Sequence, residues 1–209
     1  TQPFANCNGQ YNDGCEANLN TSVATCGACN VTCTVANGTP ASRFAFGTMQ
    51  WGGKADEGES RALYDACRAA GITHFDTAVR YAEGRSETLL GRFAQDDRDA
   101  LYIATKVGFQ GGTGRANILD QFDTCRSQLQ MDSVDLLYLH RWDAETPVEE
   151  TFETMAELQS SGAIRHIGIS NYAAWQAMKA QGACAALGTK VDAIQPMYNL
   201  VKRQAEVEI

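Results

Sequence analysis

Apolar and polar positions alternate regularly from about residue 43 to Ile209. Short segments rich in β-branched and aromatic residues are separated by longer segments with helical periodicity, and this pair recurs about every 25 to 35 residues. After a first strand that ends before Gly47, the pattern predicts strands over 72–76, 101–106, 134–140, 164–170 and 191–195. Such an alternation is typical of βα units that build a parallel sheet.

The segments between these strands carry helix signals. The first helix is predicted to bury Leu63, Ala66, Cys67 and Ala70 and to stop at Gly71. A second helix follows a glycine-rich loop and is predicted to bury Ile118, Phe122, Cys125 and Leu129. A third begins at a capping box, 146–149, with Pro at the first helical position, presents Val148, Phe152, Met155 and Ala156, and ends at Gly162. A fourth surrounds Trp175 and Met178.

Either a doubly wound sheet or a (β/α)8 barrel satisfies an α/β pattern of this kind. A dinucleotide-binding doubly wound fold has G-x-G-x-x-G after its first strand, and residues 47–52 do not match that motif. Polar residues instead end successive strands, namely Asp76, Lys106, His140, Ser170 and Gln195. A TIM barrel builds its site in this way, so we expect an incomplete (β/α)8 barrel with about six βα units.

Composition narrows the classes of partner. Lys and Arg number 17 against 25 Asp and Glu, which gives a net charge of −8, and the basic residues form no run. Nucleic acids and anionic membrane surfaces select a basic footprint, so neither is expected as a partner. The longest apolar runs, such as the one around Leu136 and Leu137, are far shorter than the roughly 20 residues that cross a bilayer, so we expect a soluble protein.

The first 40 residues differ in kind from the rest. They hold no Lys or Arg, they contain five of the eight cysteines (Cys7, Cys15, Cys26, Cys29 and Cys33), and they show neither helical nor strand periodicity. We expect a small loop-rich module over 1–40 and a barrel over 41–209. The cysteines suit disulfides in an oxidising compartment, and a zinc site of Cys15, Cys26, Cys29 and Cys33 is the alternative.

Three N-x-[ST] triplets at Asn20, Asn30 and Asn37 suit an exported segment. The run from Cys7 to Cys15, followed by Cys26-Gly-Ala-Cys29, resembles the short cysteine-rich repeats of secreted bacterial surface proteins. An odd number of cysteines leaves at least one without an internal partner.

Four residues at strand ends are candidates for joint chemistry: Asp76, Tyr81, Lys106 and His140. Their order and spacing, with Ser86-Glu87-Thr88-Leu89-Leu90-Gly91, Gly168-Ile169-Ser170-Asn171 and Tyr198-Asn199-Leu200, resemble the aldo-keto reductases, on their aryl-alcohol dehydrogenase and potassium-channel β-subunit side. Each residue alone has an ordinary structural interpretation, as a core or rim tyrosine, a cap, a solvated lysine or a core histidine. The resemblance implies reduction of a small carbonyl substrate with NADPH.

In that mechanism Tyr81 is the general acid, and a neighbouring Lys106 is expected to lower its pKa. Asp76 pairs with Lys106, because an unpaired buried charge is costly, and a neutral His140 orients the carbonyl. The resemblance also implies that the cofactor is bound by Gly47, Thr48, Asp76, Ser170, Asn171 and Gln195. For Ser170 and Asn171 a helix N-cap is the alternative. Trp51, Arg141 and Trp142 are candidates for the substrate pocket, and no metal is expected.

The stretch 43–209 is shorter than the about 250 residues of a typical TIM barrel. Strands seven and eight and most of the cofactor cradle are not found in it, so we expect the N-terminal part of a reductase, with unpaired edges on its first and last strands. The alternatives are a secreted cysteine-rich interaction module with a non-catalytic barrel remnant, and a joining of two unrelated segments. The reductase part is expected in the cytoplasm, whereas the cysteine-rich start suits an extracellular location. Substrate and oligomeric state cannot be predicted from these residues.

Overall fold

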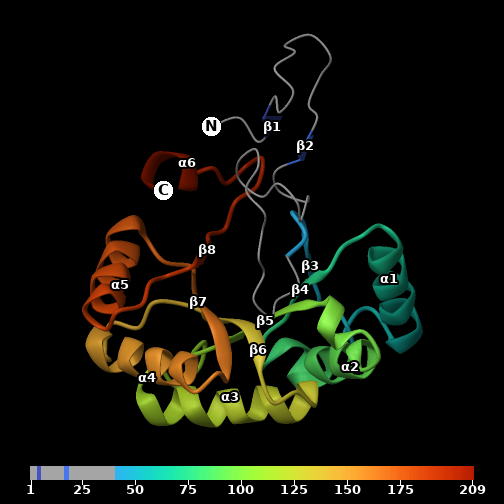
Figure 1. Ribbon diagram of the computed structural model, residues 1–209, viewed down its shortest axis with the longest axis horizontal. Coiled ribbons are helices and arrows are strands. Elements are labelled where there is room, and N and C mark those ends of the chain that lie inside the picture. Colours follow the sequence, from blue (N-terminus) through green and yellow to red (C-terminus); the bar gives the residue numbers. More distant parts are fainter. Residues whose placement is uncertain (1–3, 6–16, 19–40) are drawn as a thin grey trace.

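A curled sheet of six parallel strands forms the centre of the molecule (Figure 1). The computed structural model describes residues 4–5, 17–18 and 41–209. The strands are β3 (Ala45–Gly47), β4 (His74–Asp76), β5 (Tyr102–Val107), β6 (Val134–Leu139), β7 (Ile164–Ser170) and β8 (Ala193–Gln195). Each strand pairs with the next one in sequence, which is the order of a (β/α)8 barrel and excludes a doubly wound sheet. The predicted six-unit, incomplete barrel is confirmed.

Helices follow the strands and cover the outer side of the sheet (Figure 1). They are α1 (Glu57–Ala69), α2 (Arg85–Ala94), α3 (Arg115–Leu129), α4 (Val148–Ser160), α5 (Ala174–Ala186) and the short α6 (Ala205–Glu208), with two 3-10 helices, η1 (Tyr81–Gly84) and η2 (Arg98–Ala100). Neighbouring strands and helices therefore form successive βα units. The carboxyl ends of the strands lie at one rim, where the loops to the helices begin.

The two faces of the sheet have different cores. Residues that point outward, such as Phe75, Ile103 and Leu137, join one large apolar cluster with the helices. Residues that point into the barrel form a small cluster of Ala104, Leu136 and Tyr138, with Tyr102 and Ala193 against it. Because side chains alternate along a strand, the outward residues fix the packing while the inward ones are left for the site.

Gly168 on β7 shows how closely the inner face is packed. A Cβ atom at this position would lie 2.4 Å from Cδ1 of Tyr138 on the neighbouring β6, a separation that real side chains do not reach. The absence of a side chain on Gly168 therefore makes room for the Tyr138 ring below the site.

The predicted helices are present at the predicted positions, but the set of buried residues differs from the prediction in α1. The stripe of α3 is buried as predicted, and Gly71 and Gly162 follow α1 and α4 with φ of 78°. The buried residues of α1 are Ser60, Tyr64 and Cys67, whereas Leu63 is 41% exposed, so the stripe predicted for that helix was wrong except at Cys67.

The predicted capping box at 146–149 was also wrong. Pro147 is the N-cap residue of α4 and makes no side-chain cap, and the Thr146 hydroxyl donates to Oδ2 of Asp143 over 2.7 Å. In α5, Trp175 and Met178 lie in the predicted helix, but they are 58% and 69% exposed. The helix predicted around Trp175 and Met178 is therefore present, and the capping signal at 146–149 was overridden by the Asp143 carboxylate, which accepts from Thr146.

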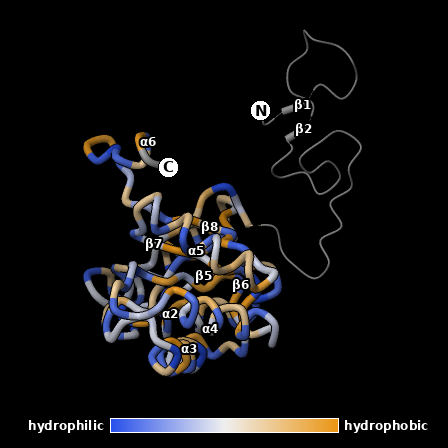
Figure 2. The backbone as a smooth tube through the Cα atoms, turned by 90° about the vertical axis from the view of Figure 1, so that its left-hand side faces the viewer, coloured by the Kyte–Doolittle hydropathy of each residue, from blue (hydrophilic) through white to orange (hydrophobic). Residues whose placement is uncertain are grey.

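The sheet has β3 and β8 at its edges, as predicted. After β8, the segment 196–209 with α6 projects away from the body of strands and helices (Figure 2), and Leu200 and Val201 there are 95% and 96% exposed. Near the start of the chain, β1 (Phe4–Ala5) pairs antiparallel with β2 (Ala17–Asn18), so two short strands lie in a region where none was predicted. Among the described residues, no helix is long and apolar enough to span a bilayer.

Candidate active site

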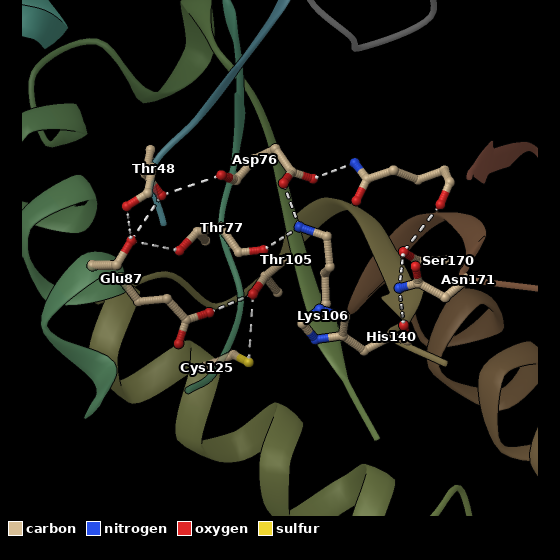
Figure 3. Close-up of polar contacts among 12 residues, drawn as sticks. Thr48, Asp76, Thr77, Glu87, Thr105, Lys106, Cys125, His140, Ser170 and Asn171 are labelled. Carbon is tan, nitrogen blue, oxygen red and sulfur yellow. Dashed lines mark hydrogen bonds and ion pairs between the residues drawn. The ribbon is translucent and has the colours of Figure 1, made fainter. Parts of the chain in front are cut away.

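A buried ion pair lies where β4 and β5 end. Lys106 is fully buried, and its Nζ forms an ion pair with Oδ1 of Asp76 and donates a hydrogen bond to the carbonyl oxygen of Thr77 over 2.8 Å (Figure 3). Burial lowers the pKa of Lys106, while Asp76 and Glu87 oppose that shift. Because parallel neighbours place these two side chains at one rim, the predicted pairing of Asp76 with Lys106 is present.

Tyr81 approaches this pair from a tight turn. After β4 the chain enters η1, in which Ala82, Glu83 and Gly84 all have positive φ. The Tyr81 ring centroid lies 5.1 Å from Nζ of Lys106. Burial, and after it the charge of Asp76, raise the pKa of Tyr81 to about 12, so the expected lowering by Lys106 is not found. Burial dominates the pKa of this phenol, and the hydrogen bonds of the ammonium go to Asp76 and Thr77.

His140 completes the group from the end of β6. Its backbone N–H donates to the Val107 carbonyl over 2.8 Å, and its ring meets the Tyr81 ring edge to face at 5.8 Å. Burial and the nearby Lys106 lower the pKa of His140 to about 4. At neutral pH the imidazole is therefore uncharged, as predicted, so one ring nitrogen donates a hydrogen bond and the other accepts one.

Thr48 lies behind Asp76 in a fully buried polar layer. Its backbone N–H donates to the Asp76 carbonyl over 2.9 Å, and its hydroxyl lies 2.8 Å from the Ser86 hydroxyl (Figure 3). The Thr48 carbonyl accepts from Ser86 as well. Gly47, the last residue of β3, is exposed, and a Cβ there would meet no atom within 4 Å. Open space for a ligand thus lies at Gly47, whereas the polar groups of Thr48 are already bound within the protein.

Ser170, Asn171 and Gln195 form a second polar group at the ends of β7 and β8. The Ser170 hydroxyl donates to the Gln195 carbonyl, and the Asn171 amide donates to the His140 carbonyl over 2.9 Å (Figure 3). Asn171 has φ of 58°, and the N-cap residue of α5 is Ala173, so the helix-cap alternative for Ser170 and Asn171 was wrong. These bonds connect the group to His140.

The same group keeps capacity for a ligand. Gln195 Nε2 donates to Oδ2 of Asp76 over 3.1 Å, but among the described residues no hydrogen bond involves Oε1 of Gln195 or Oδ1 of Asn171. A nicotinamide carboxamide needs one acceptor for its NH2 group and one donor for its oxygen. The second N–H of Gln195 Nε2 is a donor and the two oxygens are acceptors, so these residues fit the nicotinamide end of a dinucleotide.

The candidate substrate residues fall in three different places. Trp51 is 1% exposed and packs among Phe46, Tyr64, Phe75 and Phe93 on the helix side of the sheet, so the structure does not bring it to the site. Trp142 contacts Tyr172 and Trp175, which places its ring against α5. Arg141 is exposed, with its guanidinium carbon 4.9 Å from the ring centroid of Phe109. Arg141 is linked to His140 through Phe109, whose ring contacts both.

Three residues near the site were missed by the sequence analysis. Phe109, in the loop after β5, lies with its ring centroid 5.0 Å from that of His140. Tyr138 lies below Lys106, with 5.8 Å between Nζ and its ring centroid. Glu87 on α2 is fully buried behind Lys106. An aromatic residue in a loop at a strand's carboxyl end was a usable signal for Phe109, but the pattern held none for a buried acid on α2.

Metal chemistry finds no support in the described part of the chain, where no three His, Cys, Asp or Glu side chains gather in a way that could hold an ion. Cys67, Cys125 and Cys184 are buried free thiols. The five cysteines proposed for disulfides or zinc, Cys7 to Cys33, and the three Asn triplets lie outside the described residues. The predicted module over 1–40 and the secreted alternative built on it therefore stay predictions.

Comparison with known proteins supplies a family for the barrel. The model of the aldo/keto reductase family matches residues 43–209, which covers all six strands of the main sheet. The match begins after the cysteine-rich stretch and does not extend to it.

Curated relatives agree with that match. Aflatoxin B1 aldehyde reductase member 2 of Homo sapiens is 36% identical over 78% of this chain and 47% of its own length. Aldo-keto reductase YhdN of Bacillus subtilis (strain 168) is 37% identical over 82% of this chain and 54% of its own. A probable voltage-gated potassium channel subunit beta of Oryza sativa subsp. japonica is 35% identical over 80% and 54%. The chain thus spans about half the length of the curated relatives it matches.

Proposed function

Because the chain belongs to the aldo/keto reductase family, we propose that it carries the proton-transfer half of an NADPH-dependent reductase that converts small aldehydes or ketones to alcohols. The observation that carries this proposal is the buried Asp76–Lys106 pair with the rings of Tyr81 and His140 beside it. A reductase needs such a group because hydride addition to a carbonyl carbon leaves negative charge on the oxygen, which an acid must neutralise.

Tyr81 is the proposed acid. Its raised pKa keeps the phenol protonated throughout the physiological range, so the proton is present when the carbonyl oxygen develops charge. The phenol O–H bond breaks as the new O–H bond of the alcohol forms. The resulting phenolate lies near the Lys106 ammonium, which stabilises it, and Asp76 keeps that ammonium in place. This stabilisation opposes the effect of burial, which raises the pKa of Tyr81.

His140 is proposed to orient the carbonyl. A neutral imidazole donates one hydrogen bond to the substrate oxygen without bringing a second positive charge next to Lys106. Its ring is held between Tyr81 and Phe109, so the direction of that donor is set before substrate binds. Such preorganisation is worth several kcal/mol in sites where it has been removed.

The cofactor supplies the hydride. Gln195, Asn171 and Ser170 are proposed to bind its carboxamide, with Asp76, Gly47 and Thr48 around the nicotinamide. Among these, Gln195 donates a hydrogen bond to Asp76 through its side-chain amide. Preference for NADPH over NADH is carried over from the family resemblance. A reducing cytoplasm, where NADPH is abundant and the three buried thiols stay reduced, is the compartment we propose for this part of the chain.

The test is cofactor oxidation by a reductase that contains this chain, because the chain spans about half the length of its relatives. We expect the loss of NADPH absorbance at 340 nm to depend on both protein and a small aldehyde, and to fall at least 100-fold in Lys106→Met. A long apolar side chain in this place removes the charge while it keeps much of the volume. Parallel titration with NADH tests the cofactor preference. Equal rates for the wild type and Lys106→Met, or no NADPH consumption by either, would overturn the proposal.

A further inference from the structure

A buried acid next to the site, Glu87, has no role in the mechanism above. Glu87 on α2 is fully buried, and its carboxylate accepts a hydrogen bond from the Thr105 hydroxyl over 2.5 Å (Figure 3). The same hydroxyl lies 3.7 Å from the Cys125 sulfur. Burial raises the pKa of Glu87 to about 7. Burial of a carboxyl costs free energy unless its oxygens are hydrogen-bonded, so the partners of Glu87 matter.

The contacts of Glu87 lead to both proton-transfer residues. Thr105 directly precedes Lys106 on β5, so the first contact fixes the strand that carries the ammonium. The second runs through Gln128 on α3. With its amide nitrogen facing the carboxylate, Gln128 donates to Oε2 of Glu87 over 2.6 Å and to the Val79 carbonyl over 3.2 Å. Val79 lies two residues before Tyr81.

Val79 also links the segment that carries Tyr81 to β5, because its N–H donates to the Lys106 carbonyl over 3.2 Å. The turn that carries Tyr81 rests on Gln128 as well. A Cβ on Gly84 would lie 2.7 Å from Cδ of Gln128, which means that the backbone of the turn is in close contact with that amide. Glu87, Gln128 and Val79 thus form one hydrogen-bonded path from α2 to the Tyr81 turn.

We propose that Glu87 is a positioning residue that holds the Tyr81 turn against the Lys106 strand through Gln128. Its importance for catalysis rests on the proposed function, but its effect on the turn does not. The donors around it explain why an acid is required, because Thr105 and Gln128 each present a hydrogen to one of its two oxygens. Glutamine at this position turns an NH2 group toward at least one of those donors.

Local hydrogen exchange tests the proposal without any need for turnover. The amides of Val79, Tyr81 and Glu83 are bonded inside the turn and to β5. In Glu87→Gln and in Gln128→Met we expect these amides to exchange at least tenfold faster at pH 7, with β6 and β7 unchanged. Thr154→Val is the matched control, because Thr154 is fully buried but bonds only to Glu150 of its own helix.

A kinetic arm adds the catalytic consequence. Glu87→Gln should lower kcat about tenfold or more with KM within about threefold, and should add nothing further in a Tyr81→Phe background. Turn exchange unchanged in both Glu87→Gln and Gln128→Met, or equally fast exchange in every strand, overturns the positioning role. If Glu87→Gln does not fold, Gln128→Met alone decides. Absence of turnover in the wild type counts against the proposed function, and the exchange result is unaffected by it.

Discussion

The two sides of the candidate site are built differently. On the β4–β5 side, Lys106, Thr48, Thr105 and Glu87 are fully buried and bonded to one another or to Asp76. On the β7–β8 side, Asn171 is exposed, and Gln195 is only partly buried. Ser170 and Asn171 direct most of their donors to backbone carbonyls there.

The charged groups of the site therefore lie on the β4–β5 side, and neutral amides that can bind a ligand lie on the β7–β8 side. Buried charges need partners in fixed geometry, because each unpaired ion costs several kcal/mol, so the proton-transfer side must be complete before any ligand binds. Neutral amides at the rim bind water or ligand with little penalty and can keep unused acceptors. We therefore expect substitutions on the β4–β5 side to damage the fold itself, and those on the β7–β8 side to act on ligand binding.

The largest contrast should come from removing one acceptor on each side. Asp76→Ala leaves the Lys106 ammonium without its partner in a buried position, so we expect a loss of about 3–5 kcal/mol in the free energy of unfolding. Ser170→Ala removes one hydroxyl that bonds to Gln195 and Asn171, at a cost of about 1 kcal/mol. Urea unfolding of both variants measures the ratio. Equal losses would show that the two sides are built alike.

Stability should also depend on pH through Glu87. Burial raises its pKa to about 7 in the folded state from 4.5, so its contribution to stability is fully present below about pH 4.5 and is lost as pH rises through 7. We expect the stability difference between the wild type and Glu87→Gln to fall by about 2.5 kcal/mol from pH 5 to pH 8. His140 has the opposite sign, since its pKa is lowered, and it cancels in this difference. A difference that stays flat with pH would mean that Glu87 is not buried as described.

Two helical glycines give a smaller contrast. A Cβ at Gly91 in α2 would lie 2.2 Å from the Leu129 carbonyl oxygen, whereas one at Gly182 in α5 would meet no atom within 4 Å. We expect Gly91→Ala to cost about 2 kcal/mol, because backbone must move, and Gly182→Ala to stabilise by about 0.5–1 kcal/mol through helix propensity. Thermal unfolding of the pair gives the sign directly. Stabilisation by both would contradict the close contact of α2 with α3.

The sequence was sufficient to predict what adjacent parallel strands dictate. Asp76, Lys106 and His140 end consecutive strands, and their meeting follows from the topology alone. The predictions that failed depend on contacts between residues that are distant in the sequence. Trp51 is an aromatic residue at a loop start in the sequence, and only the packed fold shows that Tyr64 and Phe93 enclose it.

Two further errors have local causes. In α1, the apolar spacing at Leu63, Ala66 and Ala70 fits a helix as well as Tyr64 and Cys67 do, and contact with the sheet selects the second face. The expected lowering of the pKa of Tyr81 assumed that proximity to Lys106 is enough. The structure shows the ammonium bonded to Asp76 and Thr77, and burial then dominates the phenol. Directions of hydrogen bonds cannot be predicted from spacing.

Two tyrosines flank the Lys106 ammonium, and they provide the most direct test of the account. Tyr81 and Tyr138 have ring centroids 5.1 and 5.8 Å from Nζ, and burial raises the pKa of each to about 12, but only Tyr81 also meets His140. The measurement is the rate of NADPH-dependent aldehyde reduction by the wild type, Tyr81→Phe and Tyr138→Phe. We predict a loss of at least 100-fold for Tyr81→Phe and a change within about threefold for Tyr138→Phe. Full activity of Tyr81→Phe, or equal losses in both variants, would contradict Tyr81 as the proton donor.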